Sequence, residues 1–174
     1  MLRIAGSILA GLLAIWGVAS AGNVHFKGGG KAGPSFFDRG LTLNATGALA
    51  GLGNGDVLII LGAVGDPTGE CCNPGGSCKV PGHNPAPVQV TGSQSIPASE
   101  VKNGNVGFNV TTQAPRTPVP GAPDCPNSGW RENITDMAFT SATLTVMQGG
   151  RTVLAVDCTF GGPTVDGRVS ASCG

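Results

Sequence analysis

One short segment contains three cysteines and a histidine. All four side chains could bind a metal, and the cysteines could instead form disulfides. Cys71 and Cys72 are adjacent, Cys78 follows them, and His83 ends the cluster. Thiolate sulfur and imidazole nitrogen are ligands that zinc and copper prefer. The tight Cys-x2-Cys spacing of a zinc site is missing, however. Disulfides are the competing interpretation, and the compartment decides between the two.

Two acidic residues and a tryptophan complete the set of side chains that could take part in binding. Asp66 and Glu70 precede the cysteines, and their carboxylates could help to bind calcium, although no EF-hand loop is present. With His83 they are the residues that a small secreted hydrolase or metal-binding protein would use. Trp130 could be a ligand platform, but we favour packing against a loop or the core. Since the sequence has no Gly-x-Ser-x-Gly elbow, we predict a non-enzymatic protein.

The first residues predict export. Residues 1–21 contain one cation, Arg3, then an apolar run from Ile4 to Val18 and small residues that a signal peptidase recognises. The run is shorter than the roughly 20 apolar residues needed to cross a bilayer. We therefore predict a signal peptide helix that is removed, and a secreted or periplasmic protein without a stable membrane span. Oxidising conditions there favour disulfides, so we expect no metal and no other cofactor.

Composition excludes two further classes of protein. The 174 residues include 10 Lys and Arg against 10 Asp and Glu, so the basic excess of a nucleic-acid-binding protein is missing. The chain is 40 % hydrophobic, which is too apolar for a disordered protein. The expected partner is instead a protein or another component of the envelope or extracellular space.

Alternation of apolar and polar residues predicts short β-strands separated by turns. The segment VLIILGAV is apolar on both faces and indicates a central strand, and Gly149-Gly150 is a strong hairpin signal. No long helix is expected after the signal peptide. These patterns predict an antiparallel immunoglobulin-like β-sandwich over residues 22–174, with a jelly roll or a small barrel as the alternative. Strands are expected over 24–27, 41–46, 57–64, 88–91, 106–111, 138–146, 151–160 and 168–171.

Two long segments rich in proline and glycine interrupt the strands. Residues 65–87 and 113–129 are both longer than the roughly 12 to 15 residues usual for a loop without structure of its own. Counting strands alternately up and down places both loops at the same end of the sandwich. Because loops on a rigid scaffold commonly carry function, we expect a binding site at that end.

Strand geometry also selects disulfides among the 15 pairings that six cysteines allow. Cys158 and Cys173 face each other across the last predicted hairpin. We therefore predict a disulfide between these two residues.

The other four cysteines belong to the two long loops. We prefer a bridge between Cys72 and Cys125, which leaves Cys71 to pair with Cys78. Because Cys71 and Cys72 are adjacent in the sequence, these two assignments are interchangeable on this argument.

Three Asn-x-Thr sequons occur, at Asn44, Asn109 and Asn133. Asn44 and Asn109 fall on the polar faces of their predicted strands. We therefore expect both side chains to be exposed.

The runs GLTLNATGALAGLGNGDV, NPAPVQVTGSQSIPASEVKNGNV and PGAPDCPN resemble those of small secreted bacterial β-rich proteins of uncharacterised function. The resemblance covers most of residues 22–174. It implies export and a common cysteine set of Cys72, Cys125, Cys158 and Cys173, to which Cys71 and Cys78 are an addition. It implies no activity, so the sequence predicts an exported structural or interaction module with an unknown protein or envelope component as its partner.

Overall fold

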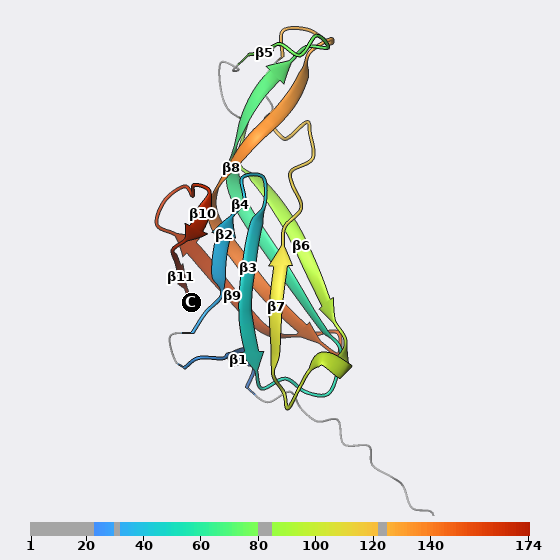
Figure 1. Cartoon of the computed structure of the whole chain (residues 1–174), viewed down its shortest axis with the longest axis vertical. Helices are drawn as coiled ribbons and strands as arrows, with labels where there is room; N and C mark the ends of the chain where they lie inside the picture. Colours follow the sequence, from blue (N-terminus) through green and yellow to red (C-terminus); the bar gives the residue numbers. More distant parts are fainter. Residues whose placement is uncertain (1–22, 30–31, 80–84, 122–124) are drawn as a thin grey trace, which may run out of the picture.

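The computed structural model describes residues 23–29, 32–79, 85–121 and 125–174, so the predicted signal peptide, residues 1–21, lies outside it. Within these residues the protein is an antiparallel β-sandwich, as the alternating patterns predicted (Figure 1). The two sheets are not closed into a barrel. The one helical element among the described residues is a 3-10 turn, Ala98–Glu100.

The first sheet is built around β3. Strands β2 and β1 pair with one edge of β3, and β7 pairs with the other; β10 adds to the outer edge of β2. The strands are β1 (His25–Phe26), β2 (Ser35–Asp38), β3 (Leu43–Ala50), β7 (Val106–Thr111) and β10 (Gly167–Val169).

The second sheet is built around two long strands. β4 pairs with β8 along its whole length, β6 and β5 pair with the other edge of β4, and β9 and β11 extend the sheet beyond β8. The strands are β4 (Val57–Cys72), β5 (Cys78–Lys79), β6 (Val88–Ile96), β8 (Arg131–Gln148), β9 (Arg151–Phe160) and β11 (Ala171–Cys173).

The core lies between the inner faces of the sheets, where alternate residues of each strand are buried. In β4 the odd-numbered residues point inward throughout. The rings of Phe36 and Phe160 meet nearly edge to face, with their centroids 5.3 Å apart, and join β2 to β9. The largest fully buried side chains include Phe36, Phe139, Leu43, Leu49, Ile59, Leu61, Ile96, Met137 and Leu144.

The two sheets are joined at both sides. On one side β10 pairs with β2 and the next strand, β11, pairs with β9, so one short stretch of chain belongs to both sheets. On the other side, the end of β7 crosses Gly92 of β6. A Cβ atom at position 92 would lie 1.9 Å from the carbonyl oxygen of Thr111, so this crossing requires glycine.

The hairpin between β8 and β9 confirms its sequence prediction. Gly149 and Gly150 form the turn with φ angles of 60° and 75°. Two consecutive residues in this left-handed region are typical of a type I′ turn, which matches the twist of the paired strands.

Much of the predicted loops is strand. β4 continues to Cys72 instead of ending at 64, and β8 begins at Arg131 instead of 138. Two register shifts, after Val64 and after Thr68, accommodate the extra residues of β8. The register directs the nitrogen of Pro67 toward the edge of β4 that faces β6 in the sandwich. Because β6 stops pairing at Gly65, this edge needs no N–H donor at position 67. The glycines and Pro67 concealed the strand pattern.

The expected exposure of Asn44 is wrong. The residue is 2 % exposed, and its amide donates to the side chains of Asn109 and Thr111 and to the carbonyl of Val110. A cross-strand polar network has taken the place of solvent. Asn109 and Asn133 are exposed.

Candidate binding site at the tip of the arm

The end of the sandwich that carries the predicted loops extends into a two-stranded ribbon, which we call the arm: residues 66–72 of β4, residues 131–138 of β8, and β5 (Figure 1). β6 stops pairing with β4 at Gly65, and β9 pairs with β8 only from Ser141 onward. At about 3.3 Å per residue, the seven residues of β4 carry the arm roughly 20 Å beyond the sandwich.

Burial of one face keeps the arm ordered, since an isolated pair of strands is only marginally stable. Pro67, Gly69 and Cys71 of β4 are buried, as is Ile134 of β8. Two segments, one containing Pro85 and the other Val119, cover this face. The ring of Pro85 would lie 3.5 Å from a Cβ atom at position 69, and Val119 is 3 % exposed.

Glu132 anchors one of these covering segments to the arm. One carboxylate oxygen accepts a hydrogen bond from the Val119 N–H at 3.0 Å. The other oxygen is buried and has no hydrogen-bond partner among the described residues. Among the described residues, this hydrogen bond is the polar contact that holds the segment to β8.

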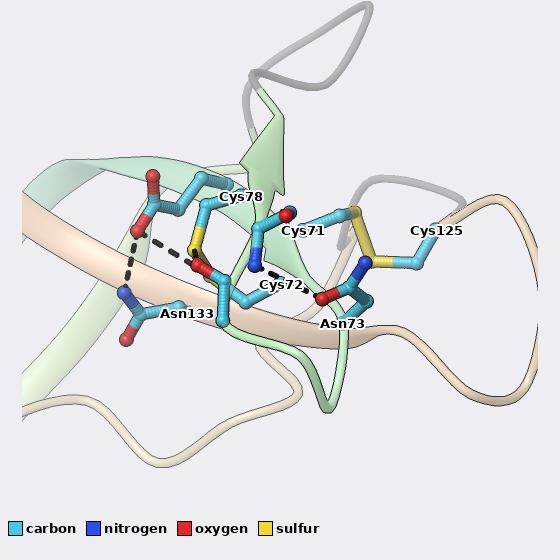
Figure 2. Close-up of a disulfide and its surroundings, with 9 residues drawn as sticks. Cys71, Cys72, Asn73, Cys78, Cys125 and Asn133 are labelled. Atoms are coloured by element: carbon cyan, nitrogen blue, oxygen red, sulfur yellow. Dashed lines mark hydrogen bonds between the residues drawn. A yellow bond between two sulfur atoms is a disulfide. The ribbon is translucent and has the colours of Figure 1, made fainter.

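Two disulfides close the tip of the arm, and they exchange the preferred partners of the sequence prediction (Figure 2). Cys71 pairs with Cys125 and Cys72 pairs with Cys78, instead of Cys72 with Cys125 and Cys71 with Cys78. Alternation along β4 decides the pairing: Cys71 is on the covered face, where Val119 packs, and Cys72 is opposite Cys78 of β5. The preferred pair of Cys72 with Cys125 is therefore absent.

A third disulfide lies in the sandwich. Cys158 and Cys173 are directly opposite each other in the β9–β11 ladder, with their Cα atoms 4.1 Å apart. This confirms the predicted pair.

Glu70, Cys72 and Cys78 bring three possible metal-ligand atoms together on the open face of the tip. These atoms lie within 4.8 Å of one another. Asn133 donates to a Glu70 oxygen at 2.8 Å and holds it 3.5 Å from the Cys72 sulfur (Figure 2). The thiolate is the form that binds a metal, and here the sulfurs are joined to each other. In the oxidised arm this cluster therefore offers the Glu70 carboxylate and the Asn133 amide to a partner.

Trp130 precedes β8 at the end of the arm and is half-buried. The Lys79 ammonium lies 5.8 Å from the centroid of its ring, at the distance of a cation–π contact. Its backbone N–H donates to the carbonyl of Asn127 at 3.0 Å. Trp130 thus packs with the loop at the tip, and the exposed Arg131 follows it.

The remaining predicted site residues do not join this cluster. Asp66 is exposed near the root of the arm, opposite Ala138. Glu70 is four residue steps farther along the strand, a distance of about 13 Å. His83 lies outside the described residues. His25, the other histidine, is on β1 at the opposite end of the sandwich and contacts the carbonyl of Asn23 (Figure 1).

A buried carboxyl group near the root of the arm escaped the sequence analysis. Asp38 is 4 % exposed, accepts hydrogen bonds from the Gly40 N–H and the Thr164 hydroxyl, and has a pKa raised above its usual value mainly by burial. Thr164 in turn accepts from the N–H of Phe139, and Gly40 accepts from that of Met137. The network therefore attaches β2 and the 161–166 loop to β8 where the arm begins. The sequence Asp-Arg-Gly at the end of a strand does not by itself predict such a buried network.

The chain matches no protein-family model, no curated protein and no solved structure. No helix among the described residues is long and apolar enough to cross a membrane. The geometry of the arm is thus the available guide to function.

Proposed function

We propose that this protein is a non-enzymatic, exported interaction module that presents its arm to a protein or envelope component outside the cytoplasm. The observation that carries the proposal is the arm itself: two strands continue past the sandwich, and two disulfides fix their tip. A protruding ribbon costs ordering entropy and adds little core. A rigid tip reduces the entropy lost when a partner binds.

The composition of the tip supports a role in binding. Trp130 offers an aromatic surface, Lys79 and Arg131 offer positive charge, and Glu70 with Asn133 offers polar groups. Tryptophan and arginine are the residues most enriched at the energetic centres of protein interfaces. The three disulfides support an oxidising compartment.

The proposal is tested by immobilising the oxidised protein and measuring retention of envelope and extracellular proteins from the organism that makes it. Trp130→Ala combined with Arg131→Ala should reduce the retained partner by about thirtyfold, the size of a typical hot spot. Leu58→Ala, at a 37 % exposed side chain on the sandwich, is the matched control and should change nothing. Equal retention by both variants would overturn the role of the tip.

Export and fold subtype are separate parts of the proposal. Determining the first residue of the mature protein tests export: residue 22 is expected at the N-terminus, and an intact Met1 contradicts a cleaved signal. The resemblance to small secreted bacterial proteins supports the same prediction, and the immunoglobulin-like subtype of the sandwich stays a prediction.

A second candidate function is metal binding by the reduced tip, which the proximity of Glu70, Cys72 and Cys78 favours. A thiol reductant would open the disulfide, and the two thiolates with Glu70 would bind zinc. Zinc titration after mild reduction should show one site that Cys72→Ser removes. The absence of a site in the reduced protein would exclude this function. The hydrolase hypothesis has no comparable observation.

A further inference from the structure

A slot of about 380 Å³ lies at the root of the arm, between the first residues of β6 and the segment that follows β7. Hydrogen bonds close it at both ends. The Gln113 N–H donates to the carbonyl of Thr91 at 2.9 Å, and the Ala86 N–H donates to that of Pro120 at 3.2 Å. Two antiparallel segments are thus joined at two points and separated between them.

The two sides of the slot differ in length, and this difference keeps them apart. Between the two closing hydrogen bonds, one side consists of residues 87–90 and the other of residues 114–119, which has to bow outward. Pro115 and Pro118 lie in the longer side, and a proline nitrogen cannot donate to a neighbouring strand. The protein therefore does not complete the sheet here with its own chain.

The register of β6 exposes an unused backbone edge inside the slot. β6 pairs with β4 without interruption from Val88 to Ile96, and Thr91 already directs its carbonyl away from β4, toward Gln113. Alternation in an antiparallel ladder then turns the N–H and C=O of Gln89 the same way. No hydrogen-bond partner for these two groups is found among the described residues.

We propose that this slot binds the C-terminal end of an extended peptide from a partner protein. The Gln89 N–H and C=O would pair with the peptide backbone as in strand addition. Because both ends of the slot are closed, a chain end fits it better than a strand that runs through. Arg116 is the one charged side chain among the lining residues, and it would receive the terminal carboxylate.

The root and the tip are independent in this scheme. The inference goes beyond the proposed function, because it concerns a different surface and a different probe. A variant at Trp130 that loses partner binding but still binds the peptide would show that the tip and the slot act separately. A variant of the slot that loses the peptide but still binds the partner would show the same.

Amide hydrogen exchange of the free protein tests the open edge directly. The Gln89 amide should exchange at least about tenfold faster than the amides of Val88 and Val90, which point toward β4. Equal protection of all three amides would show that the edge is already paired and would overturn the proposal.

Peptide binding is tested with acetyl-Thr-Val-Thr carrying a free carboxylate and with the same peptide as its C-terminal amide. The acid should shift the amide resonances of Gln89 and Thr91, and it should bind about tenfold more tightly than the amide. Arg116→Gln should remove that difference, whereas Arg151→Gln, at the exposed start of β9, should preserve it. Unshifted resonances, or equal binding of acid and amide, would overturn the proposal.

Gln89→Pro provides a second variant, since an outward nitrogen on a strand edge can be replaced by proline. It should abolish peptide binding while the circular dichroism of the sandwich is retained. Ser93→Pro, at the same register parity but outside the slot, is the control and should bind as the original protein does. Retained binding by Gln89→Pro would contradict backbone pairing.

Discussion

The sandwich and the arm share strands β4 and β8 but are stabilised in different ways. In the sandwich, inward-facing residues such as Leu61 and Leu144 are fully buried between two sheets. In the arm, the same two strands have one covered face, two covering segments and two disulfides. In the arm, the disulfides and the contacts of the covering segments thus take the place of a second sheet.

The two regions should therefore differ in flexibility. A core substitution in the sandwich removes contacts on which both sheets depend, whereas a change in the arm affects a structure that can open locally.

Leu144→Ala should destabilise the whole protein by about 2 to 5 kcal/mol, because it leaves a cavity between the sheets. Ile134→Ala, the corresponding change in the arm, should accelerate hydrogen exchange in residues 66–72 while the unfolding midpoint of the sandwich shifts much less. Denaturant unfolding and residue-level exchange measure the two effects. If both variants lower the midpoint equally, the arm and the sandwich unfold as one unit.

Replacing Cys158 and Cys173 by serine should cost about 3 kcal/mol of global stability, from the chain entropy of the 15-residue separation. The same double replacement of Cys72 and Cys78, which are six positions apart in the sequence, should cost about 2 kcal/mol, confined to the tip. Thermal unfolding reports the first effect and protease cleavage near β5 the second. A global loss from the tip variant would contradict the comparison.

Asp38→Asn should change the pH dependence of stability at the root of the arm. Burial raises the pKa of Asp38, so the folded protein binds its proton more tightly than the unfolded chain does. The contribution of this group is therefore greatest at low pH and is lost as pH rises from about 3.9 through the raised pKa. Unfolding measured between pH 4 and 7, at about half-unit steps, should show a flatter profile for the variant. An identical slope would show that Asp38 does not titrate differently on folding.

Glu132→Gln should have the smallest effect, about 1 kcal/mol or less, because the amide oxygen can still accept from Val119. Glu132→Ala removes the acceptor and should expose the Val119 segment to exchange. Protection of the Val119 amide in the alanine variant would contradict this assignment.

Period-two patterns were sufficient to predict most strands of the sandwich, the Gly149-Gly150 turn and the Cys158–Cys173 bridge, because each depends on residues close in the sequence or directly opposite. The short strand β2 was not predicted, and β3 and β6 extend to Ala50 and Ile96 instead of ending at 46 and 91. The arm was predicted as loop, since Gly65, Pro67 and Gly69 lack the β-branched side chains that mark strands. The exchanged partners of Cys71 and Cys72 depend on which face of β4 the distant segment around Val119 covers, and that is tertiary information. The slot at Gln89 likewise depends on the unequal lengths of two segments that meet only in the fold.

The joining of the two sheets by β10 and β11 determines when folding can finish. β2 forms near the start of the described residues, yet its outer neighbour β10 comes from residues 167–169, and β11 then completes the other sheet. Pairing between residues so distant in sequence is slow, because the intervening chain has to be ordered first. A chain emerging N-terminus first therefore cannot complete the sandwich until β10 and β11 are available.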